Sequence, residues 1–267
     1  MSGDWKLVEY DVSQKAVGPD VLRSLINGDT GVAVLKGLID EGELSQSRER
    51  LKTLQDETRV TRYVNGSLTL IGTFLVKHLN SLPNYFEAAR DADARLDSVG
   101  FHLTEKVRDR LREVLGLDSF EVATEDEGRR YASCNIRICA KDIDTPLHND
   151  NIMRDGIGHE TVLANLKHQL SCVVCLQGTE SGGELSIFSK PWEHADEEFK
   201  IPGGLGYHQA VVADREEIRY QPRTGDVYLL NPTNYHAVKH VYGEDRMTLG
   251  FFFGFFDDEL RSGVTWV

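Results

Sequence analysis

The first half of the chain combines one extended apolar run with helical periodicities. Residues Gly31–Leu38 are almost continuously apolar, which indicates a buried strand. Asp40 follows in a sequence typical of a capping box, which predicts a charged helix through about Glu57. Apolar residues recur at helical spacing over 103–115, with charged residues on the opposite face. We therefore expect residues 1–120 to be mainly helical and to buttress a sheet.

From Tyr131 onward, short β-branched and aromatic runs alternate with Gly, Pro, Asn and Asp, as in an antiparallel sandwich or jelly roll. The predicted strands are Tyr131–Cys139, Gln169–Leu176, Glu184–Phe188, Tyr207–Ala213, Asp226–Asn231, Tyr235–Val241 and Arg246–Phe253. A polar and then helix-like segment at about 151–168 separates the first two strands and is a candidate lid. The expected fold class is α+β, with one domain over 1–267 and a jelly-roll catalytic core over 121–267.

Charge and composition restrict the class of partner. The chain has 267 residues, with 43 acidic and 30 basic side chains, a formal net charge of -13 and a pI near 5.1. This balance opposes binding to nucleic acid and favours a small-molecule substrate. No segment approaches the ~20 apolar residues of a membrane span, and no basic segment followed by an apolar run begins the chain. We expect a cytoplasmic protein without nucleic-acid or membrane partners, as a monomer or homodimer.

The four cysteines allow a zinc site as an alternative. Cys172 and Cys175 have the Cys-x-x-Cys spacing, and Cys134 and Cys139 complete a possible four-thiolate set. However, the two valines between Cys172 and Cys175 continue a strand, and residues three apart on a strand point to opposite faces. We expect reduced cysteines in the core.

Two histidines and one aspartate have the composition of a non-haem iron site. His148 and Asp150 lie two apart at a predicted strand end, where both side chains can point to one side. His236 follows a buried strand and an Asn-Pro turn, which can deliver it from a neighbouring strand. Two imidazoles and one carboxylate form the facial set that holds Fe(II) with open positions. The alternative for the His-x-Asp is a surface turn in which the Asp caps a backbone amide. His240 is the rival for His236.

An arginine in an apolar strand strengthens the iron interpretation. Arg246 lies ten residues after His236, and Thr248 follows two residues later. Burying an arginine without an anion is costly, so a carboxylate ligand would account for it. The alternative partner is a protein acid such as Glu244 or Asp245.

The spacing of His148, Asp150, His236 and Arg246 resembles the motif of the Fe(II)/2-oxoglutarate-dependent oxygenase superfamily. More narrowly, the chain resembles the welwitindolinone-type free-standing aliphatic halogenases and their hydroxylase relatives, including N-substituted amino-acid hydroxylases. The segments that carry this narrower resemblance are Asn135–Ile138, Asn165–Ser171, Ser181–Ser186, Trp192 and Arg246–Phe252. It covers the chain from about Arg62 to the C-terminus, most strongly after Tyr131.

The resemblance implies a double-stranded β-helix, cupin-like core with Fe(II), 2-oxoglutarate and O₂ as cofactor and cosubstrates. It implies His148, Asp150 and His236 as iron ligands, and Arg246 with Thr248 as the clasp for the far carboxylate of 2-oxoglutarate. A further candidate for holding the cosubstrate or substrate is Arg137, whose alternative is a salt bridge in the barrel wall.

One position of this chain departs from the halogenase pattern, and the difference bears on the reaction. The halogenases carry Gly where Asp150 stands, and the missing carboxylate leaves a coordination position for chloride. Because Asp150 fills this position, we expect hydroxylation of an unactivated C–H bond, with release of succinate and CO₂. Halogenation, desaturation and cyclisation share the same oxidant and remain alternatives. A non-catalytic β-barrel that binds a small ligand is an alternative from another class.

The substrate is expected to be a small metabolite of natural-product biosynthesis, either an amino-acid derivative or a nucleoside-like intermediate. Candidate contacts, chosen by analogy and by polar or aromatic character, are Tyr63, Asn65, Asn151, Arg154, Trp192 and Asn234. The aromatic residues over 251–256 are expected mainly in the core, with Phe251 or Phe253 as candidates for the pocket beside the iron.

Overall fold

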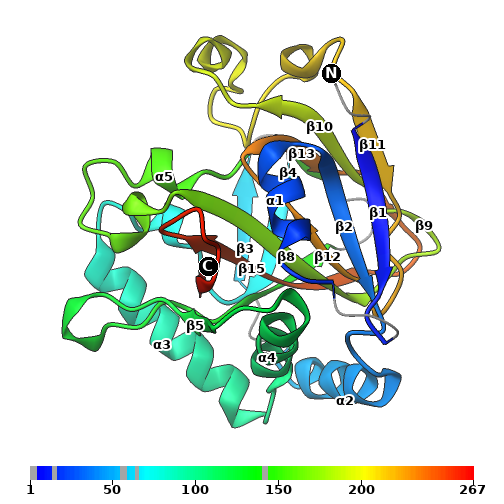
Figure 1. The fold of residues 1–267 in the computed structure, drawn as a ribbon, viewed down its shortest axis with the longest axis vertical. Coiled ribbons are helices and arrows are strands. Elements are labelled where there is room, and N and C mark those ends of the chain that lie inside the picture. Colours follow the sequence, from blue (N-terminus) through cyan, green and yellow to red (C-terminus); the bar gives the residue numbers. More distant parts are fainter. Residues whose placement is uncertain (1–4, 14–16, 55–58, 64–65, 140–143) are drawn as a thin grey trace.

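Two sheets face each other, and helices cover the outer side of the larger one (Figure 1). The structure is a computed structural model that describes residues 5–13, 17–54, 59–63, 66–139 and 144–267. None of its helices is long and apolar enough to cross a membrane, as far as these residues are concerned.

The larger sheet has ten strands: β1 (Lys6–Asp11), β2 (Thr30–Lys36), β3 (Arg59–Tyr63), β4 (Gly66–Ile71), β5 (Ser119–Val122), β6 (Asn135–Cys139), β8 (His168–Gln177), β12 (Val227–Leu230), β15 (Arg246–Phe255) and β16 (Ser262–Trp266). Their order is β1-β2-β12-β8-β15-β6-β4-β3, with β16 on β15 and β5 on β16. The smaller sheet has the order β11-β10-β13-β7 and contains β7 (Thr145–His148), β10 (Leu185–Pro191), β11 (Glu217–Tyr220) and β13 (Asn234–Val238). A short pair joins β9 (Ser181–Gly182) to β14 (Val241–Tyr242).

Strand alternation divides the apolar side chains between two cores. On β2, Val32 and Val34 point between the sheets, whereas Ala33 and Leu35 pack outward against the helices. Tyr228 and Leu230 of the larger sheet meet side chains of β10 and β11 in the inner cluster. Side chains of two sheets that interdigitate in this way form the core of a jelly roll, so the predicted fold class is confirmed.

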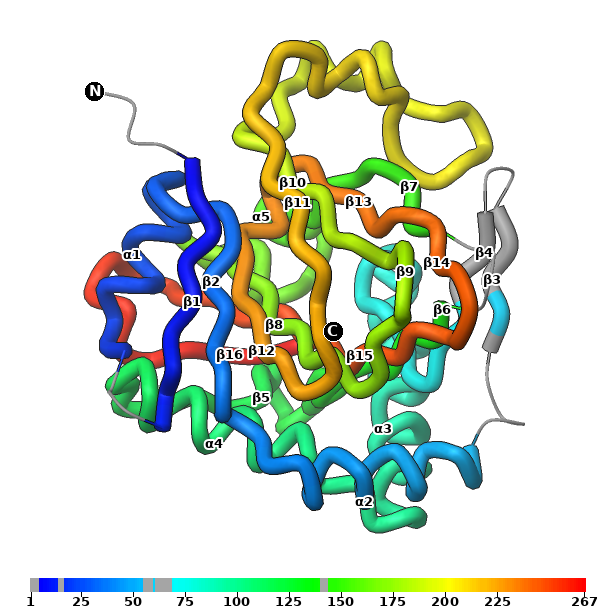
Figure 2. The backbone as a smooth tube through the Cα atoms, turned by 90° about the vertical axis from the view of Figure 1, so that its right-hand side faces the viewer, coloured from blue at the N-terminus to red at the C-terminus, as the bar shows by residue number. Residues whose placement is uncertain are grey.

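The helices pack on the outer face of the larger sheet. They are α1 (Asp20–Asn27), α2 (Glu41–Lys52), α3 (Leu82–Ser98) and α4 (Leu103–Leu115). In both views α2, α3 and α4 gather at one end of the molecule, while the segment between β10 and β11 lies at the other end (Figures 1 and 2). The buried side chains of α3 and α4 join the larger core cluster, which also contains outward residues of β6, β8 and β15.

Several predicted elements differ from those in the structure. The side chain of Asp40 accepts a hydrogen bond from the amide of Glu43 as expected, but α2 ends at Lys52 rather than near residue 57. The first 120 residues contain more helix than strand, but they also contribute β1 to β4 and the beginning of β5 to the larger sheet, and of these strands only β2 was predicted. The apolar runs of β1, β3 and β4 are short, and pairing decides their conformation: β1 pairs with β2, β3 with β4, and β4 with the more distant β6.

The predicted strand Tyr207–Ala213 is wrong. Residues Gln209–Val212 form a 3-10 helix, and its side chains Val211 and Val212 join a small apolar cluster with Tyr207. The buried positions are therefore four and five residues apart, which suits a helical turn better than a strand. The predicted strand Tyr235–Val241 is divided into β13 and β14.

The candidate lid consists of two short helices. The helix α5 (Ile152–Asp155) begins directly after the His-x-Asp, and a 3-10 turn follows at Val162–Asn165. Two cavity-lining side chains, Ile152 and Asp155, come from α5. All four cysteines are buried and form no disulfide, as expected.

Candidate metal and cosubstrate site

Strand pairing brings the two histidines together. His236 on β13 lies directly opposite His148 on β7 in the antiparallel register. The Oδ2 atom of Asp150 lies 3.7 Å from the Nε2 atom of each histidine. Ligand atoms of these three residues all lie within 4.8 Å of one another, and no other such group occurs in the part of the chain that the structure describes. His240 is therefore not part of the cluster.

Backbone carbonyl groups fix the tautomer of both imidazoles. The Nδ1 atom of His148 lies 2.8 Å from the carbonyl oxygen of Pro146, and Nδ1 of His236 lies 2.9 Å from that of Asn234. A carbonyl oxygen only accepts hydrogen bonds, so each neutral ring carries its proton on Nδ1. The Nε2 lone pairs are then free to bind a metal, and they point into the same small volume as Asp150.

The surroundings of His236 favour its neutral imidazole. His236 is 7% exposed, and burial together with the neighbouring His148 lowers its pKa to about 3. The two rings lie close, with centroids 4.2 Å apart. Neutral imidazole is the protonation state that binds metal ions, so no proton has to leave His236 at neutral pH.

Backbone contacts hold Asp150 beside the histidines. Its amide donates to the carbonyl oxygen of Pro232, in the turn that leads to His236. The next two residues are also held, because Asn151 caps α5 through the amide of Arg154, and the amide of Ile152 donates to Oε1 of Gln169 at 2.8 Å. Both ligand-bearing segments are thus tied to each other and to β8.

A cavity of about 120 Å³ opens beside the metal-ligand cluster. Its wall contains two of the three candidate ligands, His148 and Asp150. The other described residues that line it are Phe74, Leu75, Val76, Lys77, Arg137, Asp144, Thr145, Pro146, Asn151, Ile152, Asp155, Gln169, Leu205, Phe252, Trp266 and Val267. Half of these residues are apolar or aromatic, and the rest are charged or neutral polar, as in many ligand sites.

The two candidate arginines have different surroundings. Arg137 lines the cavity, stacks over Phe74 at 5.2 Å, and has no hydrogen-bond partner for its Nε atom. Arg246 is 4% exposed and does not line the cavity, and its Nη2 atom donates to the hydroxyl of Tyr228 at 2.9 Å. Neither guanidinium pairs with a carboxylate among the described residues, so neither forms the protein salt bridge that was the alternative.

These surroundings fit a bound anion. The Nε atom of Arg246 is buried without a partner, and so are both polar atoms of the Asn135 side chain. Unpartnered buried polar atoms are rare, and several on one surface indicate a polar ligand. Arg246 and Thr248 lie on the same face of β15 as Phe252, which lines the cavity. Thr248 is also the strand partner of Arg137 on the neighbouring strand β6. The donor set therefore fits both a metal ion and a carboxylate-bearing cosubstrate.

Three of the candidate substrate contacts are distributed as follows. Asn151 lines the cavity. Tyr63 lies at the end of β3, where the structure describes the backbone alone. Asn65 lies outside the described residues.

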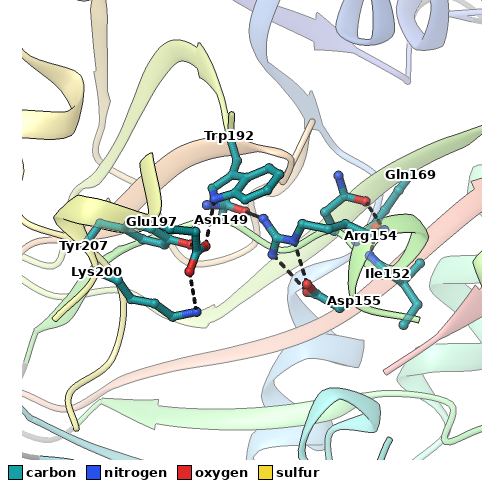
Figure 3. A network of polar contacts seen from close by, with 10 residues as sticks. Asn149, Ile152, Arg154, Asp155, Gln169, Trp192, Glu197, Lys200 and Tyr207 are labelled. Atoms are coloured by element: carbon teal, nitrogen blue, oxygen red, sulfur yellow. Dashed lines mark hydrogen bonds and ion pairs between the residues drawn. The ribbon is translucent and has the colours of Figure 1, made fainter. Parts of the chain in front are cut away.

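The other three candidates lie near the cavity without lining it. The carbonyl group of Asn234 orients His236, and the Asn234 side chain is buried. Arg154 and Trp192 stack on each other, with the guanidinium carbon 4.7 Å from the ring centroid. They belong to a polar network beside the loop that carries His148 and Asp150 (Figure 3).

Sequence patterns did not reveal several residues of the cavity wall. Gln169 was not among the predicted site residues. It occupies an inward position of β8, so the alternation of side chains along the predicted strand could have identified it. In the aromatic series, Phe252 lines the cavity, whereas Phe251 and Phe253 are core residues. Lys77 lies in a 3-10 turn that has no recognisable sequence motif. Burial and the nearby Arg137 lower the pKa of its ammonium group.

Comparisons with known proteins agree with this geometry. The family model described as "Carrier-protein-independent halogenase WelO5" matches residues 5–262. A curated relative is "Leucinostatins biosynthesis cluster protein S" of Purpureocillium lilacinum, which is 23% identical over 203 residues, or 72% of this chain and 82% of that protein.

Two solved structures share the fold. An N-substituted L-amino acid dioxygenase from Burkholderia ambifaria AMMD, in complex with alpha-KG, has a TM-score of 0.61 and 15% sequence identity, and the match covers 93% of this chain and 90% of that one. HygX from Streptomyces hygroscopicus, with nickel and 2-oxoglutarate bound, has a TM-score of 0.51 and 16% identity over 89% of this chain and 86% of that one. The chain belongs to the family of the carrier-protein-independent halogenase WelO5 and has the fold of 2-oxoglutarate-dependent oxygenases.

Proposed function

We propose that the protein is an Fe(II)- and 2-oxoglutarate-dependent dioxygenase that hydroxylates an unactivated C–H bond of a small metabolite. The observation that carries the proposal is the convergence of two imidazole Nε2 atoms and one carboxylate beside a cavity. This ligand set is typical of non-haem Fe(II) oxygenases, which keep coordination positions open on one side of the metal. Residues 1–267 would act as one catalytic domain.

Each residue of the site has a defined task in this proposal. His148, Asp150 and His236 hold the metal. Arg246 with Thr248 receives the far carboxylate of 2-oxoglutarate, and Arg137 supplies positive charge from the cavity wall. The metal and the cosubstrate together supply the oxidising chemistry, with succinate and CO₂ as coproducts. The protein orients the target carbon and excludes water through the apolar wall.

Hydroxylation is favoured over halogenation because the third protein ligand is present. The Oδ2 atom of Asp150 lies 3.7 Å from both imidazole Nε2 atoms, which supports the carboxylate as the third protein ligand, and it would then fill the position that a halide would need. The hydrogen bond that the backbone amide of Asp150 donates to the carbonyl oxygen of Pro232 helps to hold the loop in this arrangement. The family name alone does not decide the outcome, because the ligand set determines which coordination positions are available.

The cavity wall supports a substrate that combines an apolar body with polar groups. Phe74, Phe252 and Trp266 supply aromatic surface, while Lys77 and Asp155 add charges of opposite sign. An amino-acid derivative matches this combination, and a nucleoside-like intermediate is the second candidate.

Metal and cosubstrate binding can be tested without knowing the substrate. Anaerobic Fe(II) with 2-oxoglutarate should give a weak visible charge-transfer band, which His236→Ala should abolish. His240→Ala is the matched control, because His240 lies four residues away and its ring contacts that of Tyr242 outside the cluster. A band of undiminished intensity in His236→Ala would contradict the ligand assignment.

Product analysis separates hydroxylation from the alternatives. A succinate-release screen over amino acids, N-acyl amino acids and nucleotides would identify the substrate class. A product heavier by one oxygen supports hydroxylation, whereas loss of two hydrogens indicates desaturation or cyclisation, and gain of chlorine indicates halogenation. A chain that binds a small ligand without catalysis would release no succinate with any compound.

A further inference from the structure

A network of polar and aromatic contacts surrounds the loop that carries two of the candidate metal ligands (Figure 3). At its centre, Arg154 of α5 donates through Nη1 to Oδ1 of Asn149 at 2.7 Å. Its Nε and Nη2 atoms donate to the two carboxylate oxygens of Asp155, at 2.6 and 3.0 Å. A single guanidinium thus holds both Asn149, between the candidate ligands His148 and Asp150, and Asp155, in the cavity wall.

Asn149 depends on this arginine for its orientation. Its side chain is 8% exposed, and its Nδ2 atom is buried without a partner. Among the described residues, the bond from Arg154 is the one hydrogen bond that this side-chain amide makes. Loss of the bond would leave both ends of a buried amide unsatisfied, directly between two metal ligands.

On its other side Arg154 is held by the segment between β10 and β11. The guanidinium lies over the ring of Trp192, and the indole nitrogen of Trp192 donates to Oε1 of Glu197 at 3.1 Å. The hydroxyl of Tyr207 donates to the same oxygen at 3.0 Å. The cation–π contact therefore connects α5 to this segment, and the two hydrogen bonds to Glu197 hold the segment's own side chains in place.

The network closes on the strand that carries His148. The amide of Tyr207 donates to the carbonyl oxygen of Leu147 at 2.8 Å. Gly206 has a φ of +77°, and a Cβ atom at that position would lie 1.9 Å from the same carbonyl oxygen. This close approach requires glycine and fixes the segment against β7. The contacts thus form a ring from Leu147 through Glu197 and Arg154 back to Asn149.

We propose that Arg154 is a positioning residue that holds the metal-ligand loop, residues 148–155, in its binding geometry from outside the cavity. The inference rests on the proposed metal site. Arg154 touches neither the ligand atoms nor the cavity, and it acts through Asn149 and Asp155. Groups that hydrogen-bond directly to metal ligands contribute about 10- to 100-fold to metal affinity, and Arg154, which acts one contact further out, should contribute at the lower end of that range.

The test measures Co(II) binding to the full chain by the visible d–d absorption of the bound ion, with the metal alone and without turnover. Arg154→Lys keeps the charge but loses the planar fork and its stacking. We expect Co(II) affinity to fall about 10-fold, together with faster hydrogen exchange of the amides over 149–156. Arg261→Lys is the matched control, because Arg261 forms a bidentate ion pair with Asp118, and both side chains are exposed and belong to other segments of the chain than the candidate ligands. Its affinity should be unchanged.

A second variant separates positioning from general destabilisation. Trp192→Phe keeps a ring for stacking but loses the bond to Glu197, so the affinity loss should be smaller, and the double variant should lose less than the product of the two single losses. Co(II) affinity in Arg154→Lys within twofold of the unaltered protein would overturn the inference alone. Absence of Co(II) binding by the unaltered protein would overturn the proposed metal site and the inference with it. Equal melting-temperature losses in Arg154→Lys and Arg261→Lys, with weakened Co(II) binding in the first alone, would support positioning.

Discussion

Two backbone carbonyl groups set the orientation and tautomer of the imidazoles. The carbonyl oxygen of Pro146 accepts a hydrogen bond from Nδ1 of His148, and that of Asn234 accepts one from Nδ1 of His236. The histidines are thereby prepared for metal binding before any ion arrives. Asp150 differs, since no backbone group among the described residues hydrogen-bonds to its side-chain oxygen, which lies 3.7 Å from the Nε2 atom of each ring. At the scale of single residues, the aspartate is therefore the ligand whose replacement tests the reaction outcome most directly.

Replacement of Asp150 by glycine should open a coordination position for halide. We expect Asp150→Gly to bind Fe(II) more weakly and to show a chloride-dependent shift of the anaerobic Fe(II)–2-oxoglutarate band. Bromide should produce a further shift, and sulfate at equal ionic strength is the control salt. If the variant retains iron but its spectrum ignores halide, Asp150 is not the residue that divides hydroxylation from halogenation.

Replacement of Arg246 tests the cosubstrate clasp. Charge-assisted hydrogen bonds contribute about 1.5–3 kcal/mol each, so Arg246→Ala should raise the KM for 2-oxoglutarate by roughly 10- to 100-fold. The buried guanidinium also supports Tyr228, so Arg246→Lys, which keeps the charge, should recover part of the loss. Arg219→Ala is the control, because that side chain is exposed on β11. An unchanged KM in Arg246→Ala would assign the carboxylate to Arg137 instead.

At the scale of elements, the pairing of β7 with β13 builds the site, and this pairing connects residues almost ninety positions apart. The candidate ligand residues could be picked out from the sequence because the His-x-Asp, the distal His236 and Arg246 form a spaced motif, and the structure brings His148, Asp150 and His236 together. It did not predict the wall contributed by Lys77 and Trp266, because those residues reach the cavity through tertiary packing alone. Tyr207–Ala213 was misassigned for a local reason, since its buried residues follow a helical rather than a strand spacing.

The beginning of α5 offers a test of how the lid is held. Gln169→Met preserves length but removes the oxygen that accepts from the amide of Ile152. An unsatisfied buried amide costs about 1–3 kcal/mol, so the amides of α5 should exchange hydrogen faster in this variant. Gln169→Glu keeps an acceptor and should retain protection. Equal exchange rates in both variants would show that Gln169 does not hold α5.

A second test at this scale concerns the contact between α2 and α4. Glu43 accepts from Arg110 at 2.6 and 3.0 Å and from Lys106 at 2.8 Å. The hydrogen bond from Arg110 contributes most to lowering the pKa of Glu43, from 4.5 to about 2. A lowered carboxyl pKa stabilises the fold above the unfolded pKa, and this contribution is lost as the pH falls from about 4.5 toward 2.

Urea unfolding at a series of pH values should therefore separate Glu43→Gln from the unaltered protein. We expect the variant to be less stable by about 0.5–1 kcal/mol at pH 7. The difference should shrink as the pH approaches 2. A difference that stays constant over this range would attribute the loss to packing rather than charge.

At the scale of the whole molecule, the larger sheet unites distant parts of the chain. β15 lies between β8 and β6, and its outward side chains Phe251 and Phe253 pack in the core that α3 and α4 share. The same strand presents Arg246, Thr248 and Phe252 toward the other sheet. One strand thus joins the helical layer to the candidate cosubstrate site.

This central place of β15 has a consequence for biosynthesis. Roughly 115 residues separate the end of β6 from the end of β15, so a ribosome adding ~5–20 residues per second needs about 6–23 s between them. During that interval the edge of β6 that pairs with β15 stays unpaired, and so does the corresponding edge of β8 once that strand has been made; such edges favour association with other chains. We expect slower translation at low temperature and added chaperones to raise the yield of folded enzyme, because the sheet cannot close until β15 has emerged.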